Sequence, residues 1–209
     1  MSFSNDGQYI VAVIEDPQAD ADALAAAFAQ HGLDITVELL PVSPSLVGKM
    51  VMEDQDQGPD IETLFDDQAG CTLPGSTSCP IGLRIPLDFH GKAHIVLGRA
   101  GGPGEDYASA NDAFALGEAL HCSKLRGMTV QQALPVLARR GVTAVWRSND
   151  QSIDRVDGID PATIAGQYVT DAVPRSEGEV YIWAAPTPPA EPQPGTPLAD
   201  YYARLERGC

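Results

Sequence analysis

The chain has few positively charged residues. Its 209 residues include 13 Lys and Arg against 29 Asp and Glu, which gives a formal net charge of −16 at pH 7. Binding to a phosphate backbone or an anionic membrane surface requires basic side chains that replace counterions. We therefore expect no nucleic-acid partner and no binding to anionic lipid, and we attribute the surplus of carboxylates to solubility.

Long hydrophobic runs are also missing. No stretch is apolar over the roughly 18 residues that a bilayer span requires, and the N-terminus carries no signal peptide. Because the chain opens abruptly at 1–5, we expect a longer protein with its membrane segment upstream of Met1. The composition is rich in Ala, Gly, Pro and Asp and poor in Lys, as in proteins of high-GC actinobacteria.

Motifs of common catalytic and cofactor sites are absent from the sequence. No Gly-x-Ser-x-Gly elbow occurs, and no nucleophile is spaced to pair with a base. The glycine-rich stretch 98–106 lacks the Gly-Lys-Ser/Thr of a phosphate loop and ends in Glu105 and Asp106, which would repel phosphate. The acidic stretch 54–65 lacks the sixth-position Gly and the final Glu of a calcium loop. We therefore predict no catalytic residue, no cofactor and no resident metal.

The four cysteines form no Cys-x-x-Cys pair, which argues against a zinc ribbon. Cys71 and Cys79 lie in a loop of Gly, Thr, Pro and Ser, and an even number of cysteines in such loops favours disulfides in an oxidising compartment. Of the three possible connectivities, we favour Cys71–Cys79 with Cys122–Cys209. The alternative is four free thiols in a cytosolic protein.

The most regular stretch present is 127–147. Thr129 is a good N-cap and Gln132 completes a capping box, so a helix is predicted to begin there. Gly141 supplies the left-handed residue that ends the helix, and a strand is predicted after it. Pro135 is expected to remove a hydrogen bond from the helix. The apolar residues at helical spacing, predicted to face the core, are Val130, Ala133, Leu134 and Leu137.

This stretch resembles a PASTA domain, a small module appended to penicillin-binding proteins and serine/threonine kinases. The residues that fit its opening pattern are Gly127, Met128, Thr129, Ala133, Leu137, Gly141 and Val142. Those that fit its two closing strands are Gly166, Tyr168, Val169, Pro174, Gly178, Val180 and Ile182. The resemblance covers about residues 124–184. It implies an extracytoplasmic α/β module that binds cell-wall fragments or acts as a spacer, and it brings no catalytic residue.

The N-terminal stretch 6–42 follows the same order of elements. Alternating apolar residues predict a strand over 8–15 that is apolar on both faces and therefore central. Asp16-Pro17 is a helix start, and Gly32 ends the helix before a strand that begins at Leu33. Because Gly32 and Gly141 align, the two β-α-β units are either a duplication or a convergence of the same local pattern.

The middle of the chain, 43–123, is expected to be rich in strands. Residues 82–98 alternate around His90-Gly91, which predicts a hairpin, and Pro86 places its first strand at an edge or a bulge. A short strand is predicted near Met50, and Ile61, Leu64 and Phe65 suggest one or two helical turns.

Two further features lie in the middle and at the C-terminus. His90 and His94 flank the predicted turn near Asp88, where a metal would need a third ligand such as Cys122 or Glu105.

The stretch Pro186–Pro197 is a proline-rich linker, and a short helix is predicted after it. Three of its side chains are expected to dock on the body: Leu198, Tyr202 and Leu205.

The sequence therefore predicts an α/β (α+β) protein with two small β-α-β units. The expected segments are 6–42, a β-rich 43–123 with a disulfide loop, a PASTA-like 124–185 and a tail 186–209. We expect a non-enzymatic, extracytoplasmic binding or sensor domain of a bacterial envelope protein, whose partner is a cell-wall fragment or an envelope protein. The alternatives are an enzyme with a scattered site near His90, His94 and Arg99, and a structural spacer.

Overall fold

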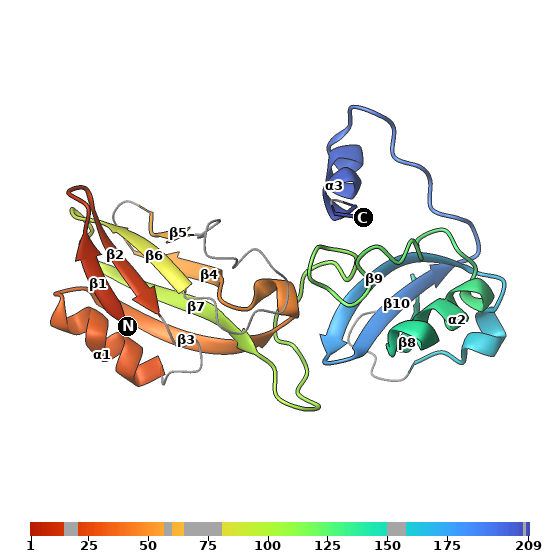
Figure 1. The fold of residues 1–209 in the computed structure, drawn as a ribbon, viewed down its shortest axis with the longest axis horizontal. Coiled ribbons are helices and arrows are strands. Elements are labelled where there is room, and N and C mark those ends of the chain that lie inside the picture. The colour runs from red at the N-terminus through yellow and green to blue at the C-terminus, as the bar shows by residue number, and fades with distance from the viewer. Residues whose placement is uncertain (15–20, 57–59, 65–80, 150–157, 207) are drawn as a thin grey trace. The chain divides into compact units, whose positions relative to one another are not determined.

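The computed structural model describes residues 1–14, 21–56, 60–64, 81–149, 158–206 and 208–209. The chain divides into two compact units, 1–101 (the N-terminal unit) and 102–209 (the C-terminal unit), each with its own elements in Figure 1. The described residues form three α-helices and three small sheets, which confirms the predicted α+β class. The division differs from the four predicted segments, because residues 43–100 share sheets and a core with the N-terminal residues.

The described residues of the N-terminal unit form two sheets, one α-helix and the short 3-10 helix η1 (Pro44–Leu46). In the first sheet, with the order β1-β2-β6-β5, all neighbours are antiparallel. In the second, with the order β3-β7-β4, β3 is parallel and β4 antiparallel to β7. The elements are β1 (Ser2–Asn5), β2 (Tyr9–Ile14), α1 (Ala21–Gln30), β3 (Asp34–Val42), β4 (Met50–Gln55), β5 (Glu62–Leu64), β6 (Ile81–Pro86) and β7 (Lys92–Ala100).

Helix α1 is held by its apolar side and by the glycine that follows it. Leu24 and Phe28 are buried in the core of the N-terminal unit, and the ring of Phe3 meets Phe28 edge-on at 5.6 Å between centroids. Gly32 has a φ of +76°, a value that L side chains rarely adopt, so the predicted helix stop is confirmed. The predicted N-terminal start of the helix at Asp16-Pro17 lies outside the described residues.

The predicted hairpin over 82–98 is wrong. Both strands exist, but β6 pairs with β2 and β5 whereas β7 pairs with β3 and β4 in the other sheet. Alternation shows which residues of a strand face the core, and it does not show which strand lies beside it. Pro86 is tolerated at the end of β6 because β5 pairs only with Gly82–Arg84, so no ladder on that side requires its missing N–H.

Two other expectations for this unit are corrected. Ile61 and Leu64 belong to no helical turn, because Glu62–Leu64 pairs with β6 as the strand β5. The stretch 6–42 is not a β-α-β unit in one sheet, since β2 and β3 belong to different sheets. Buried Ile35 and the rest of the inner face of β3 instead close the core from the second sheet.

Outside 150–157 and 207, the C-terminal unit forms one three-stranded sheet, two α-helices and long irregular segments. The sheet has the order β8-β10-β9, with β10 parallel to β8 and antiparallel to β9. The two predicted closing strands are therefore confirmed as β9 and β10. The elements are α2 (Val130–Arg140), β8 (Thr143–Ser148), the short 3-10 helix η2 (Pro161–Ile164), β9 (Tyr168–Ser176), β10 (Glu179–Ala185) and α3 (Pro197–Leu205).

The capped helix predicted at 129–141 is confirmed in detail. The Thr129 hydroxyl accepts from the Gln132 N–H, the Gln132 amide oxygen accepts from the Thr129 N–H, and Gly141 has a φ of +66°. Pro135 lies inside α2, as expected. Leu134 is the exception, since it is 40% exposed and not part of the buried face.

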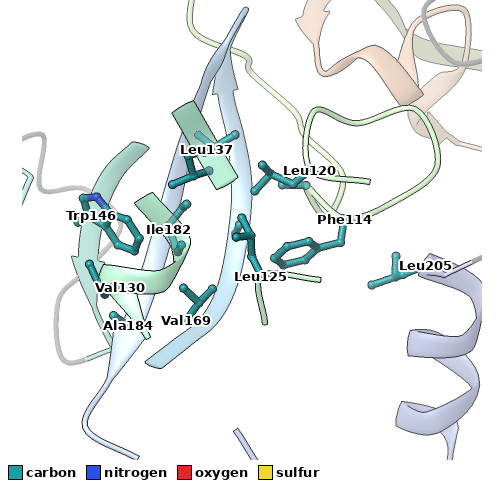
Figure 2. Packing of buried hydrophobic residues seen from close by; sticks show 14 of the residues in the cluster. Phe114, Leu120, Leu125, Val130, Leu137, Trp146, Val169, Ile182, Ala184 and Leu205 are labelled. Carbon is teal, nitrogen blue, oxygen red and sulfur yellow. The ribbon is translucent and has the colours of Figure 1, made fainter. Parts of the chain in front are cut away.

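Residues 102–129, all described, form no helix or strand and follow the outer edge of β9. The N–H groups of Tyr107, Ala113 and Gly127 donate to carbonyls along that strand at 2.7, 3.0 and 2.9 Å. The same segment adds Phe114, Leu120 and Leu125 to the core beside α2 and the sheet (Figure 2). An edge that would otherwise expose unpaired backbone groups is thus covered.

Candidate functional site

A groove of about 850 Å³ lies between the irregular segment 114–127 and the C-terminal tail (186–209), and we call it the tail groove. Its first wall comes from Phe114, Cys122 and residues 124–127. Its second wall comes from residues 188–192, from α3, and from Glu206 and Cys209 after it. Figure 1 shows how the tail leaves β10 and how α3 returns to the unit near the C-terminus. The groove is of the size that small-molecule sites commonly have.

A disulfide between Cys122 and Cys209 joins the two walls, with an S–S distance of 2.08 Å. It is one of the two pairings favoured from the sequence, whereas Cys71 and Cys79 lie outside the described residues. Cys122 has a φ of +59° and Lys124 one of +53°, so the chain turns sharply around the disulfide.

Arg126 lies at the centre of the contacts between the walls. Its guanidinium Cζ is 4.1 Å from the ring centroid of Tyr202 and 5.0 Å from that of Phe114. Nη2 lies 3.4 Å from the Asp112 carboxylate and 3.2 Å from that of Asp171, and Nε donates to the Thr170 carbonyl at 3.0 Å. The planar cation is therefore held by rings and by anions, an arrangement for which Arg is better suited than Lys.

Tyr201 adds a second polar contact between the tail and the body. Its hydroxyl donates to Asp112 Oδ2 at 2.8 Å. Burial raises the pKa of the Tyr201 hydroxyl well above its usual value, and the hydrogen bond to Asp112 and the charge of that carboxylate add to the effect. Tyr201 therefore stays protonated and keeps donating at any physiological pH.

Burial also raises the pKa of Asp171, aided by the charge of Asp112 and opposed by Arg126.

Leu205 is the one buried side chain of α3, with 8% exposure. Figure 2 shows it pointing from α3 toward Phe114 and Leu125. The predicted docking of the tail thus involves Leu205 and the half-buried Tyr202, whereas Leu198 is 50% exposed and takes no part in it.

His121 is next to the disulfide. Its Nδ1 lies 3.1 Å from the Phe114 carbonyl oxygen and its Nε2 lies 3.6 Å from Cys209 Sγ. His121, Cys122 and Cys209 bring potential metal-ligand atoms within 4.8 Å of one another. Because the two sulfurs are bonded to each other, neither is a thiolate, the form that binds metal ions. In this state the cluster does not fit a metal.

The residues of the alternative enzyme site do not converge. The His90 Nδ1 lies 2.6 Å from the Asp88 carbonyl, and His94 faces Glu38 at 3.4 Å across the second sheet. Arg99 is on β7 with His94, but the two are five positions apart, which places them about 16 Å from each other on opposite faces of the strand. Cys122 and Glu105, named as third metal ligands, belong to the C-terminal unit.

Sequence reasoning missed three of the residues that attach the tail to the body. Asp112, Arg126 and Tyr201 belong to no motif, and 89 residues separate Tyr201 from the carboxylate that it binds. The sequence feature that could have indicated these contacts is a pair of adjacent tyrosines that follows a proline-rich linker and precedes a cysteine. A second cation that the sequence did not single out, Arg147 on β8, is fully buried, with Cζ 4.7 Å from the Tyr181 ring centroid.

Comparison with known proteins gives no relative of the chain. No protein-family model, no curated protein and no solved structure matches it. Among the residues that the structure describes, no helix has the length and apolar character needed to cross a lipid bilayer.

Proposed function

We propose that the protein is a non-catalytic, extracytoplasmic binding domain of a bacterial envelope protein, and that the tail groove holds its ligand. The observation that carries the proposal is the groove itself, whose walls are joined by the Cys122–Cys209 disulfide. A structural disulfide persists in oxidising compartments such as the cell exterior, which supports the location.

The chemistry of the walls favours a cell-wall glycopeptide fragment as the ligand. Phe114, Tyr202 and the prolines at 188, 189 and 192 provide apolar surface, against which the C–H faces of sugars can pack. The exposed Lys124 offers a cation for a peptide carboxylate. The PASTA-like stretch of about 124–184 supplies part of the first wall, and its family resemblance points to the same class of ligand.

Isothermal titration of the oxidised protein with soluble peptidoglycan fragments tests this proposal. A blocking variant, Ala203→Trp, places a large ring on the α3 residue that lines the groove. Leu198→Trp is its matched control, because Leu198 is exposed on the same helix and does not line the groove. We expect saturable binding that Ala203→Trp weakens at least tenfold, equivalent to about 1.4 kcal/mol, and that Leu198→Trp leaves unchanged.

Two results would reject the proposal. Binding that is equally strong in both tryptophan variants would move the ligand away from the tail groove. No saturable binding of any fragment by the oxidised protein would favour a protein partner or a spacer role.

A further inference from the structure

The attachment of α3 to the body of the C-terminal unit has few components. Among its described residues, Leu205 is buried, and Tyr201 and Tyr202 pack half-buried against the same core. The Tyr201 hydroxyl donates to Asp112, and the ring of Tyr202 stacks on Arg126. The Cys122–Cys209 disulfide is the only covalent link between this segment and the first wall of the groove among the described residues. A nine-residue helix with so little buried surface depends on tertiary contacts for its position.

The disulfide is placed where another thiol can reach it. Both cysteines line the tail groove, and Cys209 is exposed. Disulfides buried in a core are protected from exchange, whereas the rate for an accessible one is set by the attacking thiolate and by how well the leaving sulfur is stabilised.

His121 is oriented to stabilise the leaving sulfur. A carbonyl oxygen only accepts hydrogen bonds, so the 3.1 Å contact with Phe114 places a hydrogen on Nδ1. Nε2 then faces Cys209 Sγ at 3.6 Å, with a lone pair when the ring is neutral and with a proton when it is charged. An imidazolium beside a sulfur stabilises its thiolate, which is how reactive cysteines are commonly activated.

We infer that the Cys122–Cys209 disulfide is a reversible latch, opened by thiol–disulfide exchange with a dithiol reductant, and that His121 assists the exchange by stabilising the Cys209 thiolate. In the closed state the latch holds α3 against the first wall. In the open state the weak contacts of Leu205, Tyr201 and Tyr202 hold it alone, so the second wall of the groove detaches.

The exchange balances as a two-electron reduction. A thiolate of the dithiol attacks Cys122 Sγ, the Cys122–Cys209 bond breaks, and Cys209 leaves as a thiolate beside His121 Nε2. The second thiolate of the reductant attacks the mixed disulfide, and Cys122 leaves in turn. The dithiol becomes a disulfide, and both cysteines end as thiols after they take up protons given up by the reductant.

The consequence for ligand binding rests on the function proposed above, whereas the latch itself does not. An open tail removes the wall formed by 188–192 and α3, so a ligand held between the walls is released on reduction. The groove would then bind its ligand outside the cell and lose it under reducing conditions.

The rate of native-state reduction tests the role of His121. The full chain is incubated with dithiothreitol without denaturant, quenched with iodoacetamide, and analysed by peptide mass for alkylation of Cys122 and Cys209. His121→Gln should slow their reduction roughly three- to tenfold. His90→Gln is the matched control, because His90 is exposed in the N-terminal unit, and it should have no effect.

Hydrogen exchange then tests the opening itself. In the Cys122→Ser/Cys209→Ser protein, the amides of 199–205 should exchange at least tenfold faster than in the oxidised protein, while those of α2 stay unchanged. Equal protection of α3 in both proteins would overturn the latch, as would a disulfide that dithiothreitol leaves intact in the native state. A reduction rate in His121→Gln equal to or above that of the wild type would overturn the role of His121.

The latch and the binding proposal fail in different ways. If α3 opens on reduction but the oxidised protein binds no peptidoglycan fragment, the latch stands and the proposed function falls. If the oxidised protein binds and reduction changes neither binding nor exchange, the function stands and the latch falls.

Discussion

The two units of the protein are stabilised in different ways. Residues 1–101 contain 15 acidic and four basic side chains, whereas 102–209 contain 14 acidic and nine basic ones. In the N-terminal unit two sheets and α1 enclose one apolar core. Among the described residues of the C-terminal unit, one sheet is extended by irregular segments, and these are held by Arg126, which stacks on Tyr202, and by the Cys122–Cys209 disulfide.

This difference shows what each unit is suited to do. A core closed by two sheets leaves few side chains to adjust without loss of packing. Irregular segments held at separate points, such as Arg126 and the disulfide, can form a groove whose walls come from distant parts of the chain. The difference supports our proposal that ligand binding belongs to the C-terminal unit, and we expect the N-terminal unit to be the more uniformly stable of the two.

The largest effect should come from Phe28→Ala in the N-terminal unit. Phe28 is fully buried, and truncation of a buried Phe leaves a cavity that costs about 3–5 kcal/mol. Urea unfolding followed by hydrogen exchange should show destabilised strands β2 and β7 and an unchanged α2. An equal loss of protection in α2 would show that the two units unfold together, which would contradict the claim that they are stabilised separately.

Removal of the disulfide should have the next largest effect, confined to the other unit. Cys122→Ser/Cys209→Ser opens a loop of 87 residues, and loss of a native disulfide of this kind costs about 2–5 kcal/mol. The denaturation midpoint of the C-terminal unit should fall while that of the N-terminal unit stays constant. The reduced wild-type protein is the control, and it should match the double variant.

Arg126→Lys should have a smaller effect, of about 1–2 kcal/mol. Lys keeps the charge near Asp112 but loses the flat stacking between Phe114 and Tyr202. Thermal unfolding of the C-terminal unit measures the change, with the exposed Arg139→Lys on α2 as control. Equal midpoints for the two variants would show that the stacking contributes nothing.

The smallest effect should be a pH dependence in the N-terminal unit. Burial raises the pKa of Glu53, aided by the charge of Asp60 and opposed by the Ile61 N–H that donates to it. The folded state therefore holds this proton more tightly than the unfolded state, so stability falls as pH rises above about 4.5, the ordinary Glu value. Glu53→Gln should lack this fall when urea unfolding is compared at pH 4 and pH 7. Asp54→Asn, which changes the exposed residue next to Glu53, should retain the fall in stability.

The predictable parts of the structure were those determined by neighbouring residues. The capping box of Thr129 and Gln132 lies within one helical turn, and Gly32 and Gly141 end their helices by their own backbone conformation. Strand partners were less predictable: the pattern at Leu83 and Ile95 shows inward faces but not that these residues belong to different sheets. For the same reason, the sequence did not show that 6–42 forms a core together with the later strands.

The candidate site depended on contacts that no local pattern encodes. The cysteines suggested that Cys122 and Cys209 meet, because the number of pairings is small. The stacking of Arg126 on Tyr202 and the bond from Tyr201 to Asp112 join residues far apart in the chain. Nothing in the spacing of these residues distinguishes them from the other polar and aromatic residues of the sequence. Only the fold brings them together.

The most direct test of the account is the state of Cys122 and Cys209 in the purified protein. Free thiols are blocked with iodoacetamide under native, non-reducing conditions, the protein is digested, and peptides are identified by mass before and after reduction. We predict a cross-linked peptide that contains Cys122 and Cys209 and that separates on reduction. Alkylation of both cysteines without reduction would contradict the disulfide, and with it the closed tail groove, the extracytoplasmic location and the latch.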